Sequence, residues 1–530
     1  MRSAVLLCTS CLLFACSSTP APEREGPRTV PERTGWKETS PHADVLAFLS
    51  QLDRLDHAER LVRFTFGATN EGREMVAVLV ADPPARAPEE VRGRGTFRIL
   101  INGNIHGGEV EGKEAIQLLL REFASGEHRG LLEHVTLLFV PDFNADGNDR
   151  IDPHHRATQN GPDGGVGERE NAQGLDLNRD FLKLESPECR GMLDLVRRFD
   201  PHLFLDLHTT NGSYHGYHLT YSPSLSTNVD DEIDAFARGT MIPAIRGEMA
   251  RRHRWRIFDY GNFQGQGDER SWATYDHRPR FGTNYFGLRG RFSLLSEAYS
   301  YLPFEERVAV TRDFVLETLR FAAREGEEMA SICARVDARR GSGEGVFRYD
   351  TELAPPVAGT VLVGAIEEVQ LPGDQGTRRV ALPVAEAEPM GIQDSFRSRS
   401  ADPLPEAWAV PEPPDGLAGL LQRHGIRFRL LPATEEMWVR AFDLSHIERA
   451  EAPYQGHREC RPVGSFGARE LRRLPSGTLL VPSAQPLAVL AAQLLDPRSE
   501  DSLFTWDLFE GLLDPAACPC EFPVLRVSPG

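Results

Sequence analysis

Short apolar runs alternate with amphipathic segments between residues 41 and 325, and this alternation restricts the chain to a few fold classes. Strand-length apolar runs occur at 97–101, 135–140, 202–207 and 292–295. Helical spacing of apolar side chains occurs at 110–123 and 187–199. Strands that alternate with helices form a largely parallel sheet covered on both faces. We therefore predict an α/β domain over residues 42–325, with a mostly parallel mixed sheet flanked by helices.

The pattern changes after residue 325. Residues 326–530 contain many prolines and short β-type runs such as 360–363, and residues 394–414 are typical of a linker. Residues 417–424 fit a helix and 425–430 fit a strand. A chain of 530 residues exceeds the usual domain size of about 100–200 residues. We interpret 326–530 as a β-rich accessory C-terminal region without catalytic side chains.

The formal net charge of −19 argues against a nucleic-acid partner, because such proteins carry basic patches. Five cysteines lie beyond the N-terminal region, and their spacing matches no metal site. One or two disulfides are compatible with that number, but their connectivity cannot be read from sequence.

The N-terminal residues have the pattern of a targeting signal. The apolar run at 4–15 is shorter than the roughly 20 residues of a membrane-spanning helix. Its end, Leu13-Phe14-Ala15-Cys16, resembles a bacterial lipobox, which implies a signal peptide at 1–15 and a lipid on Cys16. Ser17 then suggests the outer membrane, so we expect a cell-envelope protein that touches the membrane only through this anchor. An ordinary secretory signal is the alternative. Residues 16–41 are polar and proline-rich, so we expect a disordered tether.

A first candidate site follows the strand predicted at 97–101. In the stretch 102–109, His106 and Glu109 stand three residues apart, separated by two glycines that permit tight backbone geometry. Two histidines and one glutamate are a known catalytic zinc set. This motif alone is weak, and a third ligand must come from elsewhere in the chain.

His208 is the favoured third ligand, because it stands where the strand predicted at 202–207 ends. Sites in α/β sheets gather beyond the carboxyl ends of strands, where His106 also falls. Other histidines remain rivals for this role: His154, His155, His215 and His218.

Two further motifs contain charged residues. Glu297 follows the apolar run 292–295, and burial there would raise its pKa toward that of a useful general base. The adjacent Asn178 and Arg179 could clamp a carboxylate. Each has a simpler interpretation, as a solvent-facing strand end and a surface turn. The long polar loop 148–171 precedes the Asn-Arg pair.

Taken in order, these motifs resemble the zinc metallocarboxypeptidase family, of the carboxypeptidase A-like type: H-x-x-E, Asn-x-Asp-Gly at 144–147, Asp-x-Asn-Arg, a strand-end His and a strand-end Glu. The resemblance implies one zinc ion per chain, bound by His106, Glu109 and His208, with Glu297 as general base. It implies that Asn178 and Arg179 hold the terminal carboxylate of a substrate.

The same resemblance implies an arginine that stabilises the oxyanion and a mobile tyrosine. Arg156 and Arg169 both fit the arginine, and Arg156 is preferred; Tyr275 is preferred over Tyr285 on spacing. Arg280 or Arg289 could add a carboxylate contact.

The expected substrates are peptides or peptidoglycan-derived fragments, cleaved at their C-termini. A zinc amidohydrolase acting on N-acyl amino acids is the main alternative, because such deacylases also begin with His-Gly-x-Glu. A carboxylate-binding protein without metal is a third, but the retention of every candidate ligand and of Glu297 argues against it.

Overall fold

The computed structural model describes residues 26–210, 212–371, 376–513 and 518–529. The signal peptide expected at 1–15 and the lipid expected on Cys16 lie outside these residues. Among the described helices, none combines the length and the apolar character needed to cross a membrane. The buried cysteines Cys189 and Cys333 form no disulfide within the described part of the chain.

The central element is an eight-stranded mixed sheet with strand order β1-β2-β4-β3-β5-β10-β6-β7. The strands, in sheet order, are β1 (Leu61–Ala68), β2 (Glu74–Val80), β4 (Val135–Val140), β3 (Phe97–Gly103), β5 (Leu203–Thr210), β10 (Phe292–Tyr299), β6 (Leu219–Pro223) and β7 (Ile257–Asp259). The four inner strands β4, β3, β5 and β10 run parallel to one another. The predicted α/β class with a mixed sheet is therefore confirmed.

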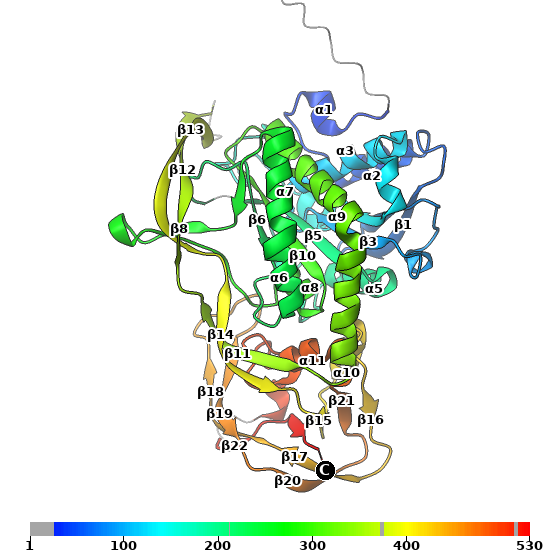
Figure 1. The fold of residues 1–530 in the computed structure, drawn as a ribbon, viewed down its shortest axis with the longest axis vertical. Helices are drawn as coiled ribbons and strands as arrows, with labels where there is room; N and C mark the ends of the chain where they lie inside the picture. The colour runs from blue at the N-terminus through cyan, green and yellow to red at the C-terminus, as the bar shows by residue number, and fades with distance from the viewer. Residues whose placement is uncertain (1–25, 211, 372–375, 514–517, 530) are drawn as a thin grey trace, which may run out of the picture.

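Helices cover both faces of this sheet (Figure 1). One face packs against α2 (His42–Leu52), α3 (Glu111–Ser125), α6 (Asp231–Phe236), α7 (Ile242–Glu248) and α9 (Phe304–Gly341). The other packs against α5 (Pro187–Phe199), α8 (Gly282–Leu288) and part of the C-terminal region. Because both faces are covered, nearly every residue of the inner strands is buried, as their continuous apolar runs predict.

The boundary expected at residue 325 is wrong, because α9 continues through it to Gly341. Gly326 lies inside this helix, where a Cβ atom would come within 2.7 Å of the Cβ of Phe97. The glycine therefore permits a close approach of α9 to β3 and does not end the helix.

The tether expected at 16–41 is also wrong for its described part. Residues 30–34 form α1 (Val30–Thr34), and both carboxylate oxygens of Glu32 lie 2.7 Å from the guanidinium of Arg121 on α3. Thr39 and Ser40 are buried and donate hydrogen bonds to Glu114. The polar side chains that suggested disorder are paired with buried charges of α3.

The C-terminal region is rich in β-strands, as predicted. Its six-stranded sheet has the order β16 (Arg429–Leu430), β21 (Leu479–Pro482), β15 (Ala407–Val410), β23 (Leu525–Val527), β17 (Glu435–Arg440) and β20 (Glu470–Leu474). A smaller sheet contains β19 (Cys460–Phe466), β18 (Phe442–Arg449) and β22 (Cys520–Glu521). The linker expected at 394–414 contains instead β15 and β14 (Phe396–Pro403), which pairs with β11 (Val346–Leu353).

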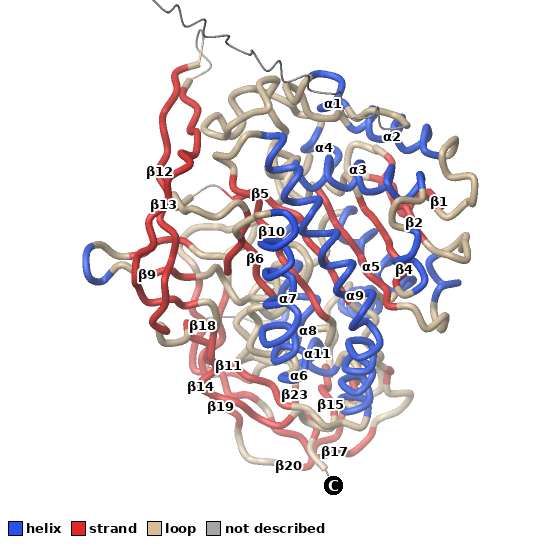
Figure 2. The backbone as a smooth tube through the Cα atoms, turned by 45° about the horizontal axis from the view of Figure 1, so that its top comes forward, coloured by secondary structure: helices blue, strands red, loops and turns tan. Residues whose placement is uncertain are grey.

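This region lies next to the domain that contains the eight-stranded sheet (Figure 2), and the two share one buried apolar cluster. The predicted helix at 417–424 is confirmed as α10 (Leu417–His424), and it shares one apolar core with α5 and with α11 (Ala488–Leu495). The long hairpin of β12 (Val357–Gln370) and β13 (Thr377–Gln393) extends a sheet with β9 (Ser271–Ala273) and β8 (Asn262–Gln264). The C-terminal region is thus an integral part of the fold.

Candidate metal centre and substrate cavity

His106, Glu109 and His208 lie together at the carboxyl end of the parallel strands. His106 and Glu109 occupy the loop between β3 and α3, and His208 lies near the end of β5. One potential ligand atom from each residue falls within 4.8 Å of the others, and all three side chains are buried. The separations from Glu109 are 2.9 Å to Nδ1 of His106 and 2.8 Å to Nδ1 of His208. Two imidazoles and one carboxylate converging in this way fit a catalytic zinc ion.

The other ring nitrogens of the two histidines face buried aspartates. Nε2 of His106 lies 3.1 Å from Asp176, and Nε2 of His208 lies 3.0 Å from Asp206. A carboxylate on the second nitrogen fixes the tautomer and orientation of a metal-binding histidine. Sequence analysis missed this role of both aspartates. The available signal was the i, i+2 spacing of Asp206 and His208, which places them on one face of a strand.

Opposing effects set the charge of this centre. Burial alone would raise the pKa of Glu109, but His106 and Arg156 outweigh it and hold this pKa well below its usual range. Burial alone would lower the pKa of His208, but the carboxylates of Asp206 and Glu109 raise it well above its ordinary value. The carboxylates around His208 therefore favour a positive charge at this centre, and a divalent metal would satisfy the same need.

The two glycines beside His106 are required by close packing. A Cβ atom on Gly107 would come within 2.4 Å of the backbone of Gly147, and one on Gly108 within 2.7 Å of the carbonyl oxygen of Gly167. The loop 148–171 therefore lies directly against the loop that carries His106 and Glu109, and larger residues would push the two apart.

Glu297 lies on β10, where it is paired in register with His208 on β5. Burial raises the pKa of Glu297 to about 8; the charge of His208 opposes the rise, and the nearby Glu109 adds to it. A bound zinc ion would lower this pKa again. A carboxyl group with a raised pKa beside a metal site is suited to proton transfer near neutral pH.

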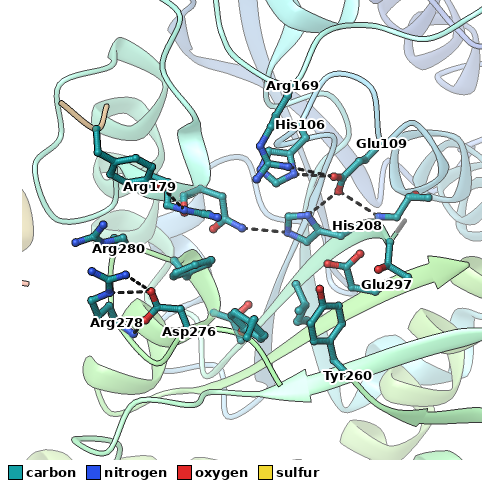
Figure 3. A pocket seen from close by; sticks show the side chains of 18 residues that line it. His106, Glu109, Arg169, Arg179, His208, Tyr260, Asp276, Arg278, Arg280 and Glu297 are labelled. Atoms are coloured by element: carbon teal, nitrogen blue, oxygen red, sulfur yellow. Dashed lines mark hydrogen bonds and ion pairs between the residues drawn. The ribbon is translucent and has the colours of Figure 1, made fainter. Parts of the chain in front are cut away.

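A cavity of about 390 Å³ opens onto the metal centre (Figure 3). Its lining includes most of the predicted site residues: His106, Glu109, Arg169, Asn178, Arg179, His208, Tyr275, Arg280 and Glu297. Asn178 is fixed by a 2.8 Å hydrogen bond that its side-chain oxygen accepts from Gly282 N–H. Burial raises the pKa of Tyr275 well above its usual value, so its phenol stays protonated and can donate a hydrogen bond.

Arg156 and Arg169 differ in what they face. Arg156 does not line the cavity; its guanidinium lies 2.6 Å from Glu109. Arg169 lines the cavity, contacts Asp176 at 2.8 Å and leaves 36% of its side chain exposed. The geometry therefore favours Arg169 where the sequence favoured Arg156, because only Arg169 faces the space that a substrate would occupy.

The remaining candidates from the sequence either lie outside the cavity or are paired with other residues. The hydroxyl of Tyr285 is 2.8 Å from the buried His424, and Arg289 donates to the carbonyl oxygen of His424. Arg280 lines the cavity but pairs with Asp501 at 2.9 Å and Glu459 at 2.6 Å. The rival histidines, namely His154, His155, His215 and His218, are absent from the described metal cluster. Sequence analysis did not identify Tyr260, Arg278 or Tyr454 as cavity residues.

Comparisons with known proteins find similarity to carboxypeptidases. Residues 46–284 match the family model described as zinc carboxypeptidase. Carboxypeptidase D from Mus musculus is 32% identical over 160 residues, which cover 26% of this chain and only 12% of the mouse protein. Carboxypeptidase 2 from Trichophyton tonsurans is 23% identical over 453 residues, which cover 82% of this chain and 77% of the fungal protein. A metallo-carboxypeptidase structure from Burkholderia cenocepacia aligns with a TM-score of 0.41 and 18% identity, over 54% of this chain and 70% of that one.

Proposed function

We propose, from the premise that residues 46–284 belong to the zinc carboxypeptidase family, that this chain removes residues from the C-terminal ends of peptides, including peptidoglycan-derived ones. The observation that carries the proposal is a single cavity lined by both the buried His106, Glu109, His208 cluster and Arg179. Zinc bound at one end of the cavity would face the scissile peptide bond of a substrate, and the guanidinium of Arg179 at the other end would face the adjacent free carboxylate.

The residues of the cavity have distinct roles in this reaction. Zinc held by the His-Glu-His cluster would polarise the scissile carbonyl and lower the pKa of a water molecule. Glu297 would accept a proton from the attacking water and return it to the leaving amine. Asn178 and Arg179 bind the terminal carboxylate of the substrate, because a guanidinium offers paired donors to it. Selectivity for free C-termini follows, since a blocked terminus leaves this cation unpaired.

We assign stabilisation of the oxyanion to Arg169. A donor in this role must reach the carbonyl oxygen of the bound substrate, and Arg169 lines the cavity whereas Arg156 contacts Glu109. Arg156 instead fixes the position of a metal ligand. The protonated phenol of Tyr275 lies in the same cavity, where it can donate a hydrogen bond to the substrate backbone.

The direct test compares three substrates by mass spectrometry. Peptides with a free C-terminus should lose single residues, chelator should stop the release, and added zinc should restore it. The same peptides with a C-terminal amide should react far more slowly. Hydrolysis of N-acyl amino acids without release from peptides would favour a deacylase, and no release from any free C-terminus in the presence of zinc would reject the proposal.

We also propose that Cys16 carries a lipid that anchors the protein in the cell envelope, on the strength of the Leu13-Phe14-Ala15-Cys16 sequence. Expression in a bacterium supplied with a labelled fatty acid should give a labelled, membrane-associated product. The Cys16→Ser variant should lack the label. Equal labelling of both proteins, or none in either, would contradict the anchor.

A further inference from the structure

A turn from the C-terminal region reaches the substrate cavity. Residues 454–457, here named the 454–457 turn, lie between β18 and β19, and Tyr454 lines the same cavity as His106 and Glu297. These residues come about 280 positions after the Asn-Arg pair, so their meeting depends on the tertiary fold.

The 454–457 turn has a constrained backbone. The N–H of Tyr454 donates to the carbonyl oxygen of His457 at 2.7 Å, and the N–H of His457 donates back at 3.0 Å. Both central residues have positive φ, 50° at Gln455 and 84° at Gly456. Glycine adopts this conformation freely, but glutamine does so at a cost. A strained residue of this kind persists only where its surroundings hold it, and such positions cluster at functional sites.

Three residues of the turn each contact the catalytic domain. The hydroxyl of Tyr454 accepts a hydrogen bond from Nε of Arg179 at 2.9 Å. The side-chain oxygen of Gln455 accepts one from the N–H of Asp176 at 2.8 Å. Nε2 of His457 lies 2.6 Å from Glu185. The first two contacts therefore hold both ends of the segment 176–179, which carries Asn178.

The contact with Tyr454 orients Arg179 without neutralising it. Nη1 of Arg179 donates to the carbonyl oxygen of Asn178 at 2.8 Å, and the guanidinium lies 3.8 Å above the ring of Phe281. Both hydrogen-bond acceptors are uncharged. Among the described residues, the nearest carboxylate to this guanidinium is that of Asp176, which lies 3.8 Å from Nη1 of Arg179. Arg179 has five N–H donors, so it retains donors and charge for a substrate carboxylate.

The C-terminal region neutralises the charge of the neighbouring Arg280. Its guanidinium is buried and paired with two carboxylates of the C-terminal region, those of Asp501 and Glu459. These pairs remove a second cation that would compete for the carboxylate of a substrate. The C-terminal region thus neutralises Arg280 and leaves Arg179 available. Arg278, which also lines the cavity, pairs with Asp276.

We propose that Tyr454 is a positioning residue for Arg179, and that the 454–457 turn completes the carboxylate-binding side of the active site. This inference rests on the proposed function, in which Arg179 binds the substrate's terminal carboxylate. The C-terminal region is accordingly part of the substrate site.

The test is the kinetic effect of Tyr454→Phe, which removes only the hydroxyl. A loosely held Arg179 binds carboxylate less well, so KM for a free-carboxylate peptide should rise about 3- to 10-fold, the range expected for one lost hydrogen bond. The value of kcat should stay within about 2-fold of wild type, because uniform binding is lost and the chemical step is not.

Tyr349→Phe is a matched control. The hydroxyl of Tyr349 also accepts a hydrogen bond from an arginine, Nη1 of Arg498 at 2.8 Å, but it lies in β11 away from the cavity. This variant should leave KM unchanged. A second variant, Gln455→Gly, removes the contact with Asp176 while relieving the strained φ. It should raise KM without lowering the melting temperature, which a merely structural role would not produce.

The outcomes separate the inference from the proposed function. If the wild-type protein releases no C-terminal residue with zinc present, the proposed function fails. If the wild type is active and Tyr454→Phe has the KM of Tyr349→Phe, the inference is wrong. The inference is also wrong if Tyr454→Phe and Tyr349→Phe raise KM equally, or if both kcat and the melting temperature fall in Tyr454→Phe.

Discussion

Each histidine of the candidate metal centre presents one ring nitrogen to Glu109 and the other to a buried aspartate. Asp206 is fully buried and also accepts a hydrogen bond from Asn102 at 3.0 Å. We predict that Asp206→Asn weakens zinc binding about 10- to 100-fold, because the imidazole of His208 loses its charged partner. Competition with a chelator of known affinity measures this. The control Asp194→Asn, at a half-exposed position of α5, should bind zinc as the wild type does. An unchanged affinity in Asp206→Asn would show that Asp206 does not support the ligand.

The role of Glu297 can be separated from that of the metal ligands. Replacement by Gln keeps the shape of the side chain but removes the base, so we expect turnover to fall about 10²- to 10⁴-fold while bound zinc is retained. Metal analysis and peptide turnover measure the two properties on one sample. Glu305→Gln, at an exposed position of α9, should have wild-type turnover. Normal turnover in Glu297→Gln would assign the base to another residue.

The carboxylate of Glu297 should also make kcat/KM depend on pH. Only the ionised form of Glu297 accepts a proton, so kcat/KM should rise with pH through the pKa of this group and then level off. Burial raises that pKa to about 8, and bound zinc lowers it, so the rise should be centred below 8. The residual activity of Glu297→Gln should lack this rise, and a profile with the same acid limb would contradict the assignment.

The clustering of the candidate metal ligands and the candidate base at one edge of the sheet could be predicted from sequence because each signal is local. His106, His208 and Glu297 each lie in or just after an apolar strand, and parallel strands bring such positions to one edge. The choice between Arg156 and Arg169 could not be made, since both lie in the same stretch of loop and differ only in where their side chains point. Tyr454 was beyond reach, because it is 275 residues from Arg179.

At the level of elements, the sequence predicted the inner strands and α3, α5 and α10 well, because each has a clear apolar period. The predictions from sequence were wrong where a tertiary contact determines the conformation of a segment. The change of pattern after residue 325 suggested a boundary, but Gly326 lies in α9 against Phe97. The polar composition of 16–41 suggested a disordered tether, but Glu32 pairs with Arg121 on α3. Neither partner can be identified without the fold.

The packing of the loop that carries His106 and Glu109 gives a prediction for stability. In Gly107→Ala, the added methyl would meet the backbone of Gly147 at 2.4 Å, so we expect a loss of about 1–3 kcal/mol in the free energy of unfolding. Urea unfolding in the presence of chelator measures this without a contribution from bound metal. Gly130→Ala is the control, because a Cβ at this position would meet no atom within 4 Å. Equal unfolding midpoints for the two variants would show that the loop yields to the methyl.

At the scale of the whole molecule, the catalytic sheet and the C-terminal region share one core. Met192 on α5, Leu421 on α10, Leu490 on α11 and Trp408 on β15 belong to a single buried apolar cluster. Burial of this size is the dominant stabilising effect in folding. The sequence suggested an accessory region because it holds no catalytic motif, but packing follows apolar surface and not catalytic motifs.

His424 joins the two parts of the molecule and makes stability depend on pH. Its Nδ1 lies 2.8 Å from the hydroxyl of Tyr285, its Nε2 lies 3.0 Å from the carbonyl oxygen of Leu182, and the side chain is fully buried. Burial lowers the pKa of His424 to about 3. The ordinary value in an unfolded chain is about 6.5. Between these two values the unfolded state binds a proton that the folded state does not, so falling pH favours unfolding.

This difference predicts a loss of about 2 kcal/mol in the free energy of unfolding between pH 7.5 and pH 5 from His424 alone. The His424→Gln variant is expected to be less stable at pH 7.5, but its stability should fall by about 2 kcal/mol less over this range than that of the wild type. Tyr285→Phe keeps the buried imidazole and should retain the wild-type dependence on pH. Urea unfolding at each pH measures all three proteins. If wild type and His424→Gln lose stability in parallel, the imidazole of His424 becomes protonated inside the folded protein, and the two parts of the molecule then meet through a charged contact.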